Sequence, residues 1–74
     1  MMIATTDGIE GKRIVETLGL VSGGYDFEKD EALEIMSASA EKLGANAVVG
    51  LRFVVREING IAELMPYGTA VRIK

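Results

Sequence analysis

Hydrophobic positions in the middle of the chain recur at helical spacing. They follow one another at intervals of six, three, four and three residues, and such intervals keep them on one face of a helix. These positions are Phe27, Leu33, Met36, Ala40 and Leu43. Asp26 precedes the run as a candidate N-cap, and Gly44 follows it as a candidate left-handed C-cap. The pattern predicts a helix over residues 27–43.

Extended segments lie on both sides of this helix. A short β-branched run at residues 2–6 ends at the turn signal Asp7-Gly8, and a second extended segment covers residues 12–22. After the helix the hydrophobic period is two from residue 45 to residue 58, and a last extended stretch covers residues 68–73. The predicted order of elements is therefore β-β-α-β-β, with a short first strand.

Asn59-Gly60 is the strongest hairpin signal in the chain, because a type I′ turn needs positive φ at both central residues. Pairing outward from this turn sets Ile58 opposite Ile61, Arg56 opposite Glu63, and Val54 opposite Met65. The opposite charges of Arg56 and Glu63 support that register. Pro66 follows, and we expect it to interrupt the last strand at an edge, a bulge or a change of sheet.

These elements predict an α+β fold in which one helix covers one face of an antiparallel sheet. Strict alternation leaves a second set of apolar side chains on the other face, where a monomer would expose them to water. This set is Val48, Val54, Ile58, Ile61 and Met65. Because an exposed apolar patch usually marks an interface, we interpret these residues as an oligomer interface.

Length and composition also favour self-association. The 74 residues suffice for one domain, which we place at residues 1–74, and a chain of this size buries only about 60% of its unfolded surface. Small domains usually offset this with disulfides, a structural metal or a partner subunit. Cysteine and histidine are both absent, while 49% of the residues are hydrophobic. Of these three means of stabilisation, association of identical subunits is the one that remains.

Charge and hydropathy exclude several classes of partner. The net charge is −3, so binding to the phosphate backbone of nucleic acids is not expected. No apolar run approaches the roughly 20 residues that span a bilayer. Residues 1–6 have neither the basic region nor the apolar stretch of a signal peptide. We therefore expect a soluble cytoplasmic protein that contacts neither nucleic acid nor membrane.

The short motifs of the chain do not assemble into a catalytic or metal site. The segment 8–12 has two residues between its glycines, where a Walker A loop needs four, and a strand follows it instead of a helix. The acidic residues at 26–30 lack the glycine of a calcium loop, and residues 39–42 match S-x-x-K without its companion motifs. The chain is thus interpreted as a non-enzyme with no cofactor and no metal site. An alternative is an enzyme whose site forms between subunits from Glu10, Tyr25 or Tyr67.

The N-terminal segment and two segments of the C-terminal half resemble a known family. Residues 3–16, continuing through 18–23, are similar to the N-terminal signature of the YbjQ-like proteins, and residues 43–51 and 68–71 are similar to its C-terminal half. The resemblance implies a dodecin-like β-α-β-β subunit in a closed homo-oligomeric ring, typically a pentamer. It also implies an uncharacterised domain labelled as heavy-metal-binding, although soft metals prefer thiolate or imidazole ligands that this chain lacks.

The chain departs from the family in one place. Family members usually carry a longer insertion between the second strand and the helix, whereas here residues 22–26 lead almost directly into the helix. The resemblance leaves two functional interpretations open. One is a domain of unknown role that binds a small ligand or metal ion between subunits; the other is a small-molecule carrier like the dodecins. Dodecins stack flavin on tryptophan, and this chain has no Trp.

Overall fold

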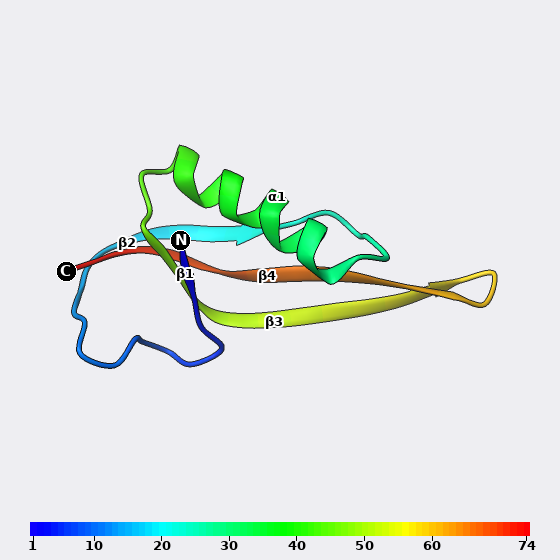
Figure 1. Cartoon of the computed structure of the whole chain (residues 1–74), viewed down its shortest axis with the longest axis horizontal. Coiled ribbons are helices and arrows are strands. Elements are labelled where there is room, and N and C mark those ends of the chain that lie inside the picture. The colour runs from blue at the N-terminus through cyan, green and yellow to red at the C-terminus, as the bar shows by residue number, and fades with distance from the viewer.

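The computed structural model describes residues 1–74 and contains four strands and one helix. They are β1 (Met2–Ile3), β2 (Ile14–Ser22), α1 (Lys29–Lys42), β3 (Ala47–Ile58) and β4 (Ile61–Ile73). The strands form a single sheet in the order β1-β3-β4-β2, and α1 lies across one face of it (Figure 1). The predicted α+β class, with one helix on one face, is confirmed. The sheet is mixed, because β1 runs parallel to β3 while the other pairs are antiparallel.

The helix is slightly shorter than predicted. Its N-cap is Glu28, which makes no side-chain cap hydrogen bond, and Asp26 is not the cap that the sequence suggested. The backbone of Asp26 is committed to β4, where it exchanges two hydrogen bonds with Leu64 at 2.9 and 2.8 Å. Its side chain instead accepts the backbone N–H of Glu28 at 2.9 Å. Phe27 therefore precedes the helix and is exposed.

The C-terminal end of α1 agrees with the prediction. Leu43 is the C-cap and Gly44 follows it with a φ of +88°, the left-handed conformation that ends many helices. The helix is only 14 residues long, so it is too short to cross a membrane.

Buried side chains lie on both faces of the inner half of the sheet. The face under α1 holds a cluster of seven residues: Val21, Met36, Ala40, Ala45, Val48, Leu51 and Ala70. The opposite face holds a second cluster of Ala47, Val49, Val71 and Ile73. Ile9, from the loop between β1 and β2, packs against this second cluster. That loop therefore acts as the second covering layer of the inner half.

A β-bulge in β3 breaks the predicted alternation of side chains between the two faces of the sheet. Between Val49 and Arg52 the register with β4 shifts, so β3 carries one extra residue there. Gly50 provides the bulge with a φ of +65°. As a result Val48 faces α1 and is fully buried, and its assignment to the oligomer interface is wrong. The residues beyond the bulge keep the predicted pairing.

The hairpin forms in the predicted register. Asn59 and Gly60 both have positive φ, +52° and +80°. Beyond this turn the predicted cross-strand pairs are all present: Ile58 with Ile61, Arg56 with Glu63, and Val54 with Met65.

Pro66 does not interrupt β4, which runs unbroken from Ile61 to Ile73. The position of Pro66 explains why the strand continues. Pro66 stands opposite Phe53 on β3, and it lies one residue beyond the last pair with β2, Ser22 with Tyr67. The carbonyl oxygen of Pro66 still accepts the N–H of Gly23 at 3.0 Å. Only one potential bond toward the β2 side is lost, so the ladder with β3 stays intact.

Candidate functional site on the hairpin arm

The outer half of the β3–β4 hairpin, residues 53–65, is called here the hairpin arm. Its outer end extends beyond both α1 and the loop between β1 and β2 (Figure 1). Only the segment before α1, with Tyr25 and Phe27, lies against it. Five of its large apolar side chains are exposed: Phe53 (37%), Val54 (38%), Val55 (61%), Ile58 (47%) and Ile61 (53%). A two-stranded hairpin with bare faces is only marginally stable in water. The arm is therefore the part of the molecule that most needs a partner surface.

Three of the predicted interface residues are exposed on this arm. Val54, Ile58 and Ile61 lie on the face turned away from α1, and Met65 lies among them half-buried. Pro66, the next residue of β4 after Met65, is buried toward α1. Because successive side chains of a strand point to opposite faces, Met65 and the residues paired with it face the other way. Val48 is not part of this surface.

A charged and aromatic cluster lies in the middle of the same face. The Nε of Arg56 donates to Oε1 of Glu63 at 2.9 Å, and the guanidinium carbon of Arg56 lies 3.8 Å from the centroid of the Tyr25 ring. The Asp26–Leu64 backbone pair brings Tyr25 to this position, because it holds the segment before α1 against β4. Cation–π contacts of this kind are worth about 0.5–1 kcal/mol at exposed sites. The cluster holds Arg56 in one orientation.

A small hollow of about 260 Å³ lies beside this cluster, near the tip of the arm. Its lining residues are Phe27, Ile58, Asn59, Ile61 and Glu63. Phe27 is 63% exposed, so the hollow is open and largely apolar, with one carboxylate at its side. Its volume is slightly below the roughly 300–1,000 Å³ of typical small-molecule sites. It would fit a small apolar group better than a large cofactor.

A second hollow of about 370 Å³ lies between α1 and the N-terminal residues. It is lined by Met1, Ile3, Asp30, Leu33, Glu34, Ser37, Ala38 and Glu41. Its three carboxylates form no ion pair, since the two ion pairs of the chain are Arg56–Glu63 and Glu16–Arg72. A lining with three carboxylates and a single N-terminal ammonium disfavours phosphate-bearing ligands.

The donor groups of a single chain do not fit a heavy-metal ion. The chain has neither cysteine nor histidine, and no three Asp or Glu side chains converge on one point. The thioether of Met36 is fully buried in the core beneath α1, and Met65 is half-buried on the arm. Soft metal ions require converging thiolate, thioether or imidazole ligands.

The structure does not assemble the three residues considered for catalysis. Glu10 is exposed in the N-terminal loop and makes no ion pair. Tyr67 is half-buried in β4, opposite Arg52, and its side chain makes no hydrogen bond. Tyr25 is engaged with Arg56. The stack of Tyr25 on Arg56 was not foreseen, because the backbone pair that creates it joins segments far apart in sequence.

A family model and individual relatives match this chain to the same family. Residues 25–74 match the family model YbjQ_1, whose description reads "Putative heavy-metal-binding". The chain is also similar to curated proteins named UPF0145. One from Methanocaldococcus jannaschii is 40% identical, with 100% of this chain and 93% of that protein covered. One from Thermosipho africanus is 36% identical, with 100% and 96% covered.

These alignments are longer than the chain itself. The alignment with the Thermosipho protein is 104 positions long and that with the Methanocaldococcus protein is 84, against the 74 residues of the chain. The relatives therefore carry residues that this chain lacks. Among solved structures, a protein of unknown function of the DUF74 family from Pediococcus pentosaceus matches with a TM-score of 0.63 and 26% identity. That alignment covers 100% of this chain and 98% of the other.

Proposed function

The chain belongs to the YbjQ-like family of UPF0145 proteins, and from that premise we propose that it is a non-enzymatic homo-oligomeric domain. Its subunits close into a ring, a pentamer as the resemblance to the YbjQ-like family implies, and a small ligand is held between neighbouring subunits. The setting is the cytoplasm that the sequence suggests.

The bare hairpin arm carries this proposal. The apolar side chains of Val55, Ile58 and Ile61 are each about half exposed or more, although they belong to long, regular strands. A neighbouring subunit that covers them recovers roughly 25 cal/mol for each Å² of apolar surface removed from water. The Arg56–Tyr25 stack adds side chains of the types that dominate protein interfaces.

The hollow beside Phe27 supports the ligand part of the proposal. It lies on the arm, so the same subunit contact that covers Ile58 and Ile61 would also enclose it. Its apolar lining suits a small organic molecule. A heavy-metal ion is a poor candidate there, because Glu63 is the only carboxylate among the lining residues.

Native mass spectrometry on protein purified without added ligand tests both parts of the proposal. We expect a closed assembly of 7.9 kDa subunits that carries additional mass from the ligand. Val54→Lys should dissociate it, since a lysine would bury an unpaired charge between subunits. Asp7→Lys, which adds a lysine in the N-terminal loop, is the matched control and should leave the assembly intact. A wild-type monomer at cellular protein concentration would contradict the proposal.

A further inference from the structure

The sheet has two open edges. On one side β2 is the last strand. On the other side β1 pairs with Ala47 and Val48 alone, and the last backbone bond from the N-terminal segment to β3 runs from Leu51 N–H to Ala4 C=O at 3.0 Å. Beyond that point, residues 52–58 of β3 have β4 as their only neighbour.

The ladder pattern shows which backbone groups of β3 point out of the sheet. Ile58 and Ile61 flank a two-residue turn, so they form a hydrogen-bonded pair, and antiparallel pairs alternate between bonded and non-bonded. The groups of Phe53, Val55 and Glu57 therefore point to the open edge. An independent contact agrees with this assignment. Leu64, which faces Val55, directs both its backbone groups away from β3 and toward Asp26.

The same reasoning applies to β2. The bond from Gly23 N–H to Pro66 C=O fixes that pair as a bonded one, and alternation then turns the groups of Leu20 and Ser22 outward. None of these five outward-pointing residues makes a backbone hydrogen bond outside the sheet ladders. Both edges thus present free donors and acceptors.

The side chains on the two edges are unusual for edge strands. Leu20 (75% exposed) and Val55 (61%) are the two most exposed large apolar residues in the strands, and they stand on opposite edges. Residues 20–22 contain no charged residue and no proline, and residues 53–57 contain no lysine or proline. Of the two charged residues at 53–57, Arg56 is paired with Glu63 and Glu57 remains. Both edges are therefore competent to pair with another strand.

Strand direction indicates what that other strand is. Because β2 and β3 are each antiparallel to β4, they run parallel to one another within the sheet. A second copy rotated head to tail thus brings its β2 alongside β3 in the same parallel sense that β1 already adopts. A head-to-tail contact that closes into a ring leaves neither edge exposed. A foreign peptide would satisfy one edge only.

We propose that residues 20–22 of β2 in one copy pair in parallel with residues 53–57 of β3 in the next copy. The inference rests on the self-association proposed above and names the surfaces that meet. The register that uses both outward residues of β2 places Val55 between Leu20 and Ser22. In that register Val55 N–H donates to Leu20 C=O, and Ser22 N–H donates to Val55 C=O.

Proline substitutions at outward-facing positions test this pairing. Val55→Pro and Ser22→Pro each remove an N–H that no intrachain bond uses, so each monomer fold is retained, as circular dichroism would verify. We expect both variants to lose the assembly and run as monomers in native mass spectrometry. Val55→Thr and Ser22→Thr keep the N–H and should stay assembled.

Mixing the two proline variants makes the test specific for a head-to-tail joint. Val55→Pro keeps an intact β2 edge and Ser22→Pro keeps an intact β3 edge, so the mixture should form a one-to-one heterodimer and nothing larger. If wild-type protein assembles but both proline variants assemble equally well, the edge pairing is wrong while self-association stands. A monomeric wild type would overturn both.

Hydrogen exchange on the wild-type assembly provides a second measurement that needs no variant. The amides of Val55 and Ser22 should exchange slowly, although the single chain leaves them free. Exchange at the rate of an unprotected amide at these two positions would overturn the pairing, even if the proline variants failed to fold.

Discussion

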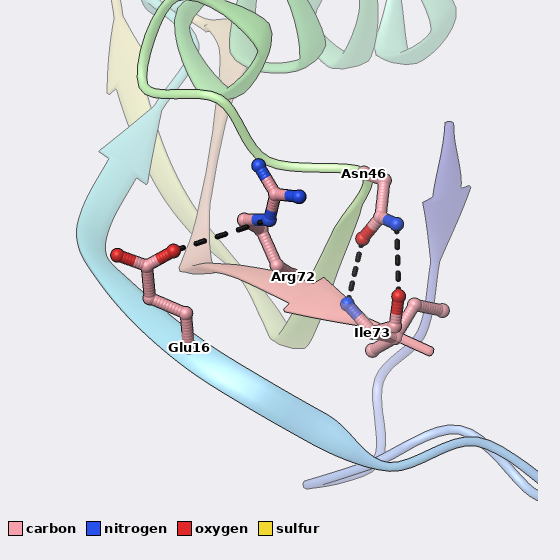
Figure 2. A network of polar contacts seen from close by, with 4 residues as sticks. All are labelled: Glu16, Asn46, Arg72 and Ile73. Atoms are coloured by element: carbon pink, nitrogen blue, oxygen red, sulfur yellow. Dashed lines mark hydrogen bonds and ion pairs between the residues drawn. The ribbon is translucent and has the colours of Figure 1, made fainter.

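The side-chain amide of Asn46 exchanges two hydrogen bonds with the backbone of Ile73 (Figure 2). Nδ2 of Asn46 donates to the Ile73 carbonyl oxygen at 3.0 Å, and the Ile73 N–H donates to Oδ1 at 2.8 Å. Since β3 begins at Ala47, opposite Val71, no residue of β3 stands opposite Ile73. The amide of Asn46 takes the place of that missing strand neighbour.

Replacing Asn46 should therefore destabilise the end of β4. Asn46→Ala leaves two backbone groups of the nearly buried Ile73 without partners, which costs about 1–3 kcal/mol of unfolding free energy. Asn46→Asp should cost more, because a carboxylate would face the Ile73 carbonyl oxygen. Urea denaturation at fixed protein concentration measures both, with the exposed Thr5→Ala as a control expected within about 0.5 kcal/mol of wild type. Equal stability of Asn46→Ala and wild type would show that the paired bonds contribute nothing.

The bulge at Gly50 leads to a second prediction. A Cβ on Gly50 would meet no atom within 4 Å, so Gly50→Ala adds backbone strain without a clash. At a φ of +65° that strain amounts to about 1–2 kcal/mol. Gly24 is the matched control, since a Cβ there also meets nothing and its φ is not in the left-handed region. We expect thermal denaturation to show a lower midpoint for Gly50→Ala and an unchanged or raised midpoint for Gly24→Ala.

The two ion pairs of the chain should differ in strength. Arg56 and Glu63 are joined at 2.9 Å, and the Glu63 side chain is only 16% exposed. Glu16 and Arg72, at 3.9 Å, are both more than half exposed (Figure 2). A double-mutant cycle to alanine should give a coupling near the upper end of the 0.2–1 kcal/mol found for exposed pairs in the first case, and one near zero in the second. Equal couplings would mean that neither the shorter distance nor the burial of Glu63 strengthens the Arg56–Glu63 pair.

Much of the fold follows from local sequence. The apolar spacing from Leu33 to Ala40 predicted α1, and Asn59-Gly60 fixed the hairpin and its register, because both signals act over a few residues. The wrong assignment of Val48 arose from a single extra residue in β3. The extra residue at Gly50 reverses the facing of the strand around it, so Val48 was assigned to the wrong side. A single glycine in an apolar strand does not reveal whether it forms a bulge.

The candidate site was only partly predictable. Val54, Ile58 and Ile61 were identified from alternation, since their pairing depends on the hairpin turn alone. The hollow beside Phe27 and the stack of Tyr25 on Arg56 depend on the Asp26–Leu64 backbone pair. That pair joins the segment before α1 to a strand nearly forty residues later, and no local pattern encodes it.

Because the chain lacks suitable donor side chains, we expect it not to bind heavy-metal ions tightly. With no cysteine or histidine, and with Met36 buried beneath α1, the accessible charged or sulfur donors are carboxylates, the N-terminal methionines and the half-buried Met65. Scattered carboxylates bind Zn²⁺ weakly, and Cu⁺ prefers sulfur ligands that converge. Isothermal titration of the assembled protein with Zn²⁺, and with Cu⁺ under reducing conditions, should therefore show no stoichiometric binding at micromolar concentrations. Stoichiometric binding of either ion would contradict this expectation and would place a site between subunits. In that case Met65→Leu, which preserves side-chain volume but removes the thioether on the arm, would test whether this face supplies a ligand.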